Sequence, residues 1–230
     1  MPDTFVIDVR ETPSIPVTGQ KGRFPVHRIY CVGRNYAAHA REMGKDPDKE
    51  PPFFFCKPAD AILPDGGEMH YPPGTSNLHH EIELVVALHR GGFQIPAARA
   101  LDHVYGYAVG LDMTRRDLQI QARDMGRPWD FGKAFDESAP ITAIYPVASH
   151  GHHSTGAITL DVNGEQRQKA DLQDMIWNVP DTIAFLSNYY RLQPGDLIFT
   201  GTPAGVGAVV RGDKMVGKVE GLAELRVTLV

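Results

Sequence analysis

Proline and glycine constrain this chain more than any other feature of its sequence. Its 230 residues include 18 prolines and 23 glycines, distributed along the whole length. Proline cannot continue a helix and glycine weakens one, so these residues divide the chain into short segments joined by turns. Short runs rich in Val, Ile, Leu and aromatic residues lie between them and favour strands. The sequence therefore predicts a mixed α/β fold that is mostly β, with helices at its edges.

Apolar patterning places the individual elements. Strands are expected at residues 29–32, 81–88, 103–113, 158–162, 197–200 and 222–229, with an edge strand at 5–9. Helices are expected at 36–43, 114–125, 171–177 and 181–190, with Asn35 and Thr114 as the first two N-caps. Asn163-Gly164 predicts a tight hairpin turn. Residues 1–23 are expected to form a short N-terminal arm, and residues 24–230 one catalytic domain.

Composition excludes several classes of protein. Hydrophobic residues make up 42% and charged residues 22% of the chain, which is typical of a globular domain. A net charge of −5 disfavours nucleic acid or an anionic membrane as the main partner. No run approaches the ~18 apolar residues that a membrane helix requires, and the first residues lack a signal-peptide pattern, so a cytoplasmic protein is expected. Cys31 and Cys56 lie in apolar runs and are expected to be buried free thiols.

Three acidic residues form the first candidate site. Glu81 and Glu83 are two apart in an expected strand, so their side chains point to the same side. Asp112 follows the next strand. Carboxylates that share a face repel one another unless water or a cation compensates, and such oxygen ligands suit Mg²⁺ or Mn²⁺. The alternative is a solvated strand face followed by a turn, and spacing alone favours that alternative.

Histidines offer further candidates. His39 and Glu42 are three apart in an expected helix and share a face, so the carboxylate can orient the imidazole for activating water. A surface pair is the alternative. His79 and His80 suggest an iron site, but neighbouring strand residues point in opposite directions. The histidines at 150–153 are expected in an exposed loop.

Several of these segments together resemble the fumarylacetoacetate hydrolase family. The matching motifs occur in the family's order over roughly residues 24–230. They are Val32-Gly33-Arg34-Asn35-Tyr36, Lys57-Pro58, Glu81-Ile82-Glu83, Gly110-Leu111-Asp112, Gly132-Lys133 and Gly201-Thr202-Pro203.

This resemblance implies a fold and a set of site residues. The fold would be a β-roll or sandwich-like barrel of mixed strands with peripheral helices, usually paired as a homodimer. The resemblance implies a metal on Glu81, Glu83 and Asp112, usually Mg²⁺, with Mn²⁺ or Ca²⁺ as alternatives. The implied catalytic residues are His39 as base, Glu42 as its partner, and Lys133. The implied substrate-binding residues are Arg34, Tyr36, Arg116, Gln119, Gly201 and Thr202.

The resemblance also implies hydrolysis of a carbon–carbon bond in a small 2,4-dioxo acid. The segments at 51–61 and 127–131 are most similar to compact members that act on fumarylpyruvate in gentisate-type aromatic catabolism. That substrate carries a second carboxylate, for which an arginine is suited. The candidates are Arg34, Arg41, Arg123 and Arg127. An acylpyruvase, an oxaloacetate decarboxylase and a non-catalytic metal-binding protein remain as alternatives.

Overall fold

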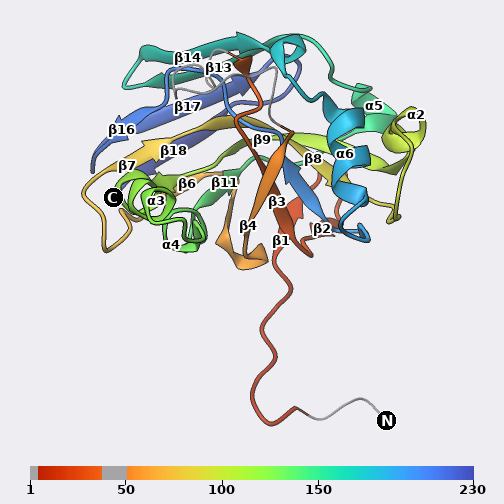
Figure 1. Ribbon diagram of the computed structural model, residues 1–230, viewed down its shortest axis with the longest axis horizontal. Coiled ribbons are helices and arrows are strands. Elements are labelled where there is room, and N and C mark those ends of the chain that lie inside the picture. Colours follow the sequence, from red (N-terminus) through yellow and green to blue (C-terminus); the bar gives the residue numbers. More distant parts are fainter. Residues whose placement is uncertain (1–4, 38–50) are drawn as a thin grey trace.

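Two layers of β-sheet form the body of the protein (Figure 1). The computed structural model describes residues 5–37 and 51–230. The larger sheet has eight strands. Seven follow one another across it: β4 (Phe53–Lys57), β3 (Ile29–Gly33), β15 (Leu197–Phe199), β8 (Ile82–Leu88), β9 (Val104–Leu111), β11 (Ala139–Ile141) and β5 (Ile62–Pro64). The eighth, β12 (Tyr145–Pro146), also pairs with β9.

A five-stranded sheet packs across the larger one. Its order is β14 (Glu165–Asp171), β13 (Ala157–Val162), β17 (Lys214–Val219), β18 (Leu225–Leu229) and β6 (Gly67–Met69). A three-stranded sheet consists of β10 (Thr114–Arg115), β7 (Leu78–His80) and β16 (Gly207–Val209), and β1 (Ser14–Pro16) pairs with β2 (Arg23–Pro25). The described part of the chain is thus mostly β.

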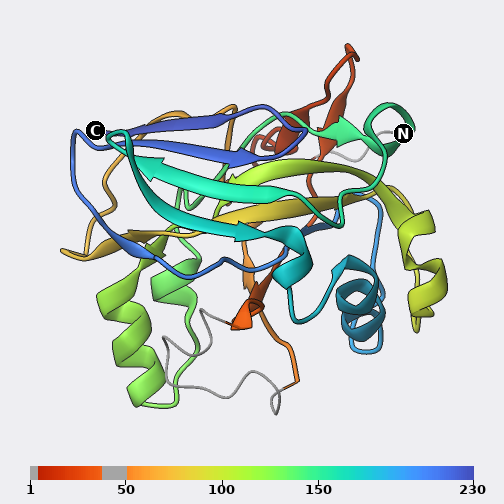
Figure 2. The ribbon, with the colours of Figure 1, turned by 90° about the horizontal axis from the view of Figure 1, so that it is seen from above.

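Helices lie at opposite ends of these sheets (Figures 1 and 2). At one end are α3 (Arg116–Asp124) and α4 (Asp130–Lys133). At the other are α2 (Ala97–Ala100), α5 (Val147–His150) and α6 (Val179–Ser187). Single 3₁₀ turns occur at η1 (Ala59–Ala61), η2 (Leu101–His103) and η3 (Leu172–Asp174). None of the helices among the described residues has the length and apolar character needed to cross a bilayer.

Strand β8 is buried on both faces, which decides where the acidic residues lie. Ile82 and Leu84 belong to the large core between the two sheets. Val85 and Ala87 belong to a second, smaller core on the opposite side of the curled sheet. Because side chains alternate along a strand, Glu83 shares the face of Val85 and points into the interior. Glu83 is 1% exposed, so the alternative of a solvated strand face is wrong.

Most expected elements are present. Strands were found at β3, β8, β9, β13, β15 and β18, and helices at α3 and α6, close to the expected bounds. The hairpin after β13 turns at Asn163 and Gly164, whose φ angles are 54° and 83°. Positive φ at both positions is what a tight hairpin requires, and Asn and Gly adopt it readily.

Other local expectations are wrong or lie outside the described residues. Residues 5–9 form no strand, and 171–177 contains only the 3₁₀ turn η3. Thr114 is not an N-cap, because it pairs with His79 in β10 and the helix begins at Arg116. Strand β17 was not expected. The expected helix at 36–43 lies outside the described residues beyond Ala37, and the domain boundary at residue 24 stays a prediction.

The two cysteines differ in environment. Cys31 is buried in the smaller core and Cys56 is exposed, so the expectation of burial is wrong for Cys56. They occupy the neighbouring strands β3 and β4, and both are free thiols. Side-chain alternation along β4 explains the difference, because Lys57 takes the buried position that follows Cys56.

Candidate active site

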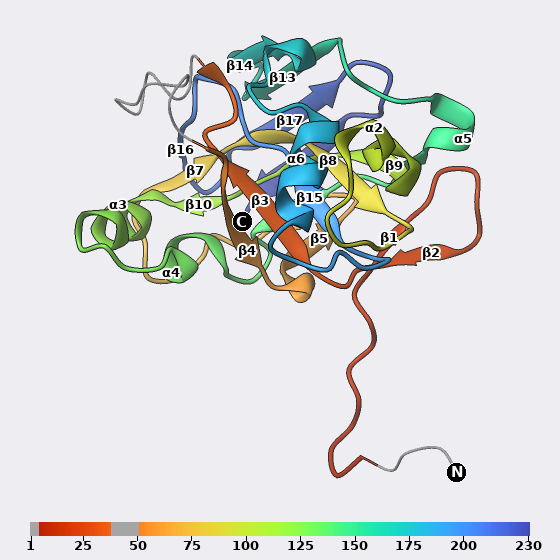
Figure 3. The ribbon, with the colours of Figure 1, turned by 45° about the vertical axis from the view of Figure 1, so that its right-hand side comes forward.

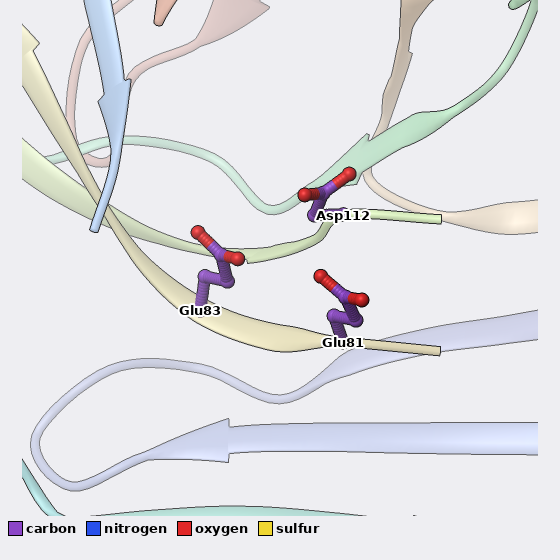
Figure 4. Close-up of side chains that lie close together, drawn as sticks. All are labelled: Glu81, Glu83 and Asp112. Carbon is purple, nitrogen blue, oxygen red and sulfur yellow. The ribbon is translucent and has the colours of Figure 1, made fainter. Parts of the chain in front are cut away.

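Glu81, Glu83 and Asp112 converge on one point in the interior (Figure 4). One carboxylate oxygen from each lies within 4.8 Å of the others, and all three residues are buried. Glu81 immediately precedes β8 and Glu83 is its second residue, while Asp112 follows β9, which pairs antiparallel with β8. The backbone N–H of Asp112 donates to the carbonyl of Glu81 at 2.8 Å, which brings the third acid beside the first.

Three cations balance two of these carboxylates. Lys133 Nζ donates to Glu81 Oε2 at 2.8 Å and to Asp112 Oδ2 at 2.6 Å. Arg116 Nη2 donates to Glu81 Oε1 at 2.5 Å. Lys57 Nζ lies 2.9 Å from Asp112 Oδ1, although its hydrogen bonds go to the carbonyls of Met113 and Lys133.

Lys133 is held as an ammonium group. Burial lowers its pKa, but the carboxylates of Asp112 and Glu81 raise it, and the resulting pKa lies above the ordinary value. Its third hydrogen bond goes to Thr114 Oγ1 at 2.7 Å. Lys133 is 2% exposed and sits beside the acids, so it is a charged donor placed inside the pocket.

Glu83 differs from the other two acids because no cation pairs with it within the described part of the chain. Its one hydrogen bond comes from the backbone N–H of Gly201, at 2.8 Å from Oε2. Burial, together with repulsion from Asp112 and Glu81, raises its pKa well above the usual value. A further positive charge is therefore needed at this point if all three carboxylates are to be ionised.

A divalent cation fits this donor set. Oxygen ligands from buried carboxylates are those that Mg²⁺, Mn²⁺ and Ca²⁺ prefer. Asp112 Oδ1 is buried and accepts no directed hydrogen bond from the described residues, despite the nearby Lys57 ammonium. The unpaired charge of Glu83 and this unused oxygen both face the same cluster. The three acids would hold the ion, with Lys133 and Arg116 as their partners.

Gln168 supports the site from behind, although its sequence context gave no sign of this. Gln168 Oε1 accepts from His80 Nδ1 at 3.0 Å and from the N–H of Ile82 at 3.1 Å. Its amide nitrogen donates to Thr202 Oγ1 and to the carbonyl of Pro203, both at 2.8 Å. The buried amide of Gln168 therefore links the backbone of Ile82, which lies between the two glutamates, to the loop that follows β15.

Asn35 joins three other segments in the same way. Its side chain donates to the carbonyls of Trp177 and Thr200 at 2.8 and 2.7 Å and accepts from the N–H of Trp177 at 2.7 Å. The neighbouring Gly201 has a φ of 95°, and a Cβ there would lie 2.7 Å from that of Asn35. Only glycine allows this approach, which places the Gly201 N–H on Glu83.

Two connected cavities lie over the acids. A narrow pocket reaches them and includes Arg34, Arg116, Gln119 and Thr202 in its lining. A cavity of about 600 Å³ continues outward, lined by aromatic residues of β4 with Trp129 and Tyr190. Arg34, Phe53, Phe55, Trp129 and Lys133 line both. The arrangement is a polar inner pocket with an aromatic outer chamber.

The remaining expected residues fall into distinct places. Tyr36 is 2% exposed, lies in the large core and lines neither described cavity. His39 and Glu42 lie outside the described residues. His79 Nδ1 accepts from Arg116 Nε at 3.4 Å, while His80 contacts Gln168, so the two imidazoles serve different partners. Burial and the positive charge of Arg116 lower the pKa of His79 to about 4, so it is neutral near pH 7.

Comparison with known proteins identifies the family. The model of the fumarylacetoacetate hydrolase C-terminal domain matches residues 28–230. The chain belongs to the fumarylacetoacetate hydrolase family. A fumarylpyruvate hydrolase from a Ralstonia species is 51% identical over 189 residues, covering 81% of this chain and 98% of the relative. The human mitochondrial oxaloacetate tautomerase is 41% identical over 197 residues, covering 86% of this chain and 89% of the relative.

A solved structure of a family member has the same fold. The crystal structure of fumarylpyruvate hydrolase from Pseudomonas aeruginosa in complex with Mn²⁺ and pyruvate superimposes with a TM-score of 0.97. It is 55% identical in sequence, and the match covers 99% of both chains. The expected mixed, mostly β family fold is thus confirmed.

Glu83 should contribute less to the stability of the metal-free protein as pH rises. The folded-state pKa of Glu83 lies above the ordinary value of 4.5. The stability that its neutral form contributes is therefore complete below pH 4.5 and is lost as pH rises through the raised pKa. Bound metal favours the ionised form, so the rise in melting temperature on adding Mn²⁺ should grow with pH. Melting curves with and without Mn²⁺ between about pH 5 and 8 measure this. A metal-induced rise that shrinks with pH would contradict the assignment.

Proposed function

We propose that this protein is a divalent-metal-dependent hydrolase that converts fumarylpyruvate to fumarate and pyruvate. The main support is that the acidic pocket opens into the aromatic chamber and that Arg34 lines both. A 2,4-dioxo acid has a 2-oxo carboxylate end that suits a metal and cationic residues. The acyl portion would extend into the chamber. We propose Mg²⁺ as the native ion, with Mn²⁺ and Ca²⁺ as alternatives.

The proposed reaction divides its tasks among this chain's residues. When bound, the metal would supply Lewis-acid stabilisation of negative charge on the 2-oxo oxygen. His39, oriented by Glu42, takes a proton from water as the water oxygen bonds to C4. We assign the Gln119 amide as the donor to the oxyanion at C4, with the Lys133 ammonium as a positive charge beside it. As the C3–C4 bond breaks, its electron pair passes to C3, and the proton held by His39 returns there to give pyruvate.

Arg34 is our candidate for the far carboxylate of the substrate. Its guanidinium lies 5.2 Å from the centre of the Phe53 ring, in the lining of both cavities. Its φ of 59° is uncommon for a residue other than glycine, and such backbone conformations cluster at functional sites. Arg123 instead pairs with Asp124 on the surface. Arg127 lines a separate cavity, and Arg41 lies outside the described residues.

Replacing Arg34 with methionine should reduce kcat/KM for fumarylpyruvate by about 10- to 100-fold, because a charged hydrogen bond contributes roughly 1.5–3 kcal/mol. The loss for acetylpyruvate, which has no distal carboxylate, should be smaller. Arg123→Met is the matched control and should leave both values unchanged. Equal losses for the two substrates would assign Arg34 to the shared 2-oxo acid end instead.

A substrate comparison tests the function itself. Purified protein with Mg²⁺ or Mn²⁺ should consume fumarylpyruvate faster than acetylpyruvate, seen as loss of dioxo-acid absorbance with equimolar pyruvate. Oxaloacetate is the third substrate, because the oxaloacetate tautomerase relatives are 40–42% identical to this chain. Faster turnover of acetylpyruvate would indicate an acylpyruvase. Turnover of oxaloacetate alone would indicate enol or decarboxylation chemistry, and no turnover would favour a metal-binding protein.

We further propose a homodimer in the cytoplasm that serves aromatic catabolism. The family relationship supports pairing, and two free cysteines suit a reducing compartment. The fumarylpyruvate hydrolase relatives support the metabolic role. Sedimentation of the purified chain measures the oligomeric state directly.

A further inference from the structure

The N-terminal segment 5–13 leaves the body of the protein as an extended arm (Figures 1 and 3). It carries Phe5, Val6, Ile7 and Val9 within five residues, and each of these is at least 64% exposed. Residues 5–9 make no hydrogen bond or ion pair with the rest of the described chain. Mobile tails are usually polar, whereas this stretch has the apolar, β-branched character of a segment that becomes covered.

The body directs the arm outward, away from its own surface. The carbonyl of Pro13 accepts from the N–H of Val26 at 2.8 Å, and strand β1 begins at the next residue. Arg10 forms an ion pair with Asp60 at 3.6 Å, which ties the base of the arm to the surface. Since the chain departs from these fixed points into solvent, a second molecule is the natural cover for its apolar residues.

A matching groove occurs on the same chain. A cavity of about 340 Å³ lies between α3 and α4, with Leu118, Ala122, Met125 and Phe131 in its lining. Phe131 is 81% exposed and Met125 55% exposed, so this surface is also uncovered. Arg127 also lines this groove and is opposite in sign to Asp8 of the arm.

We propose that the arm of one copy lies in the α3–α4 groove of a second copy, and that the exchange is reciprocal. In an extended arm, Phe5, Ile7 and Val9 share one face, which would enter the groove, while Val6 faces away. A chain that carries both halves of a contact is suited to two-fold pairing. The groove is formed by the helices that carry Arg116, Gln119 and Lys133, so each arm would brace the partner's site.

This inference deepens the proposed homodimer and does not depend on the reaction, because association is measured without metal or substrate. Analytical ultracentrifugation of the full chain provides the dissociation constant. Val9→Ser should weaken association by about 100-fold, since two symmetric contacts each lose a buried valine. Val6→Ser makes the same chemical change on the other face and should have little effect. If Val9→Ser weakens pairing no more than Val6→Ser does, the proposal is overturned.

The groove is tested separately and then together with the arm. Met125→Ser/Phe131→Ser should weaken association, whereas Ile120→Ser, on α3 but outside the groove lining, should not. A mixture of the groove variant with Phe5→Ser/Ile7→Ser should associate more tightly than either variant alone, because the mixed dimer keeps one intact arm–groove contact. Weakening by the arm variants without this complementation would overturn the groove as the binding surface.

Discussion

Replacing Glu83 with glutamine should abolish tight divalent-metal binding and reduce kcat/KM for fumarylpyruvate by about 10³-fold or more. The size follows from the several kcal/mol that a metal ion contributes to charge stabilisation. Glu83 is the acid without a cationic partner in the described structure, so its charge is the one that the metal would compensate. Titration calorimetry with Mn²⁺ and steady-state kinetics measure the two losses.

The same substitution should not destabilise the metal-free fold, which separates loss of a ligand from general damage. Glutamine removes a buried charge that Asp112 and Glu81 repel, and its amide oxygen can still accept from the Gly201 N–H. The metal-free variant should therefore melt at or above the wild-type temperature near pH 8, with no rise on adding Mn²⁺. Glu68→Gln, at an exposed position of β6, is the matched control. A Glu83→Gln protein that binds Mn²⁺ normally would remove Glu83 from the ligand set.

Replacing His39 with alanine should reduce hydrolysis of fumarylpyruvate by about 10²- to 10⁴-fold, the usual contribution of a general base. Because His39 is proposed to act on water and not on the metal, the Mn²⁺-induced rise in melting temperature should remain at its wild-type value. Glu42→Gln should give a smaller loss, since its role is to orient the imidazole. His150→Ala, at the end of α5, should leave the rate unchanged.

Oxaloacetate gives this prediction a second measurement. Loss of CO₂ requires no water nucleophile, so any decarboxylation by this enzyme should survive in His39→Ala better than hydrolysis does. Parallel assays of both substrates on the same preparation compare the two activities directly. Full hydrolytic activity in His39→Ala would refute its assignment as the base.

The choice between a metal site and a solvated strand face shows what sequence spacing can and cannot decide. Alternation along a strand correctly predicts that Glu81 and Glu83 point to one side. It does not say what covers that side. The face of Glu83 is closed by the smaller core, whose residues come from strands far apart in the chain, such as Cys31 of β3 and Phe199 of β15. Buried carboxylates need a positive charge to stay ionised, and their burial is decided by the tertiary structure.

Supporting residues show the same limit. Lys57 was noticed only as part of a motif, and Gln168 and Asn35 had no assigned role at the site. Gln168 is separated from its partner His80 by 88 positions, and Asn35 from Thr200 by 165. No local period or spacing connects such residues, because their hydrogen bonds depend on how the sheets pack.

By itself, the sequence determined the mostly β class, the strands beside the acids and the hairpin at Asn163-Gly164, because these depend on local conformational preference. It also determined the family motifs, which are read directly from the order of residues. The tertiary structure alone decided that Lys133 and Arg116 pair with the acids and that Glu83 lacks such a partner among the described residues. It also decided that Arg34 lies between the polar pocket and the aromatic chamber. The apolar arm also needed the structure, because the apolar run at 5–9 predicted an edge strand. A strand forms only where another strand offers hydrogen bonds, and the described part of this chain offers none to the arm.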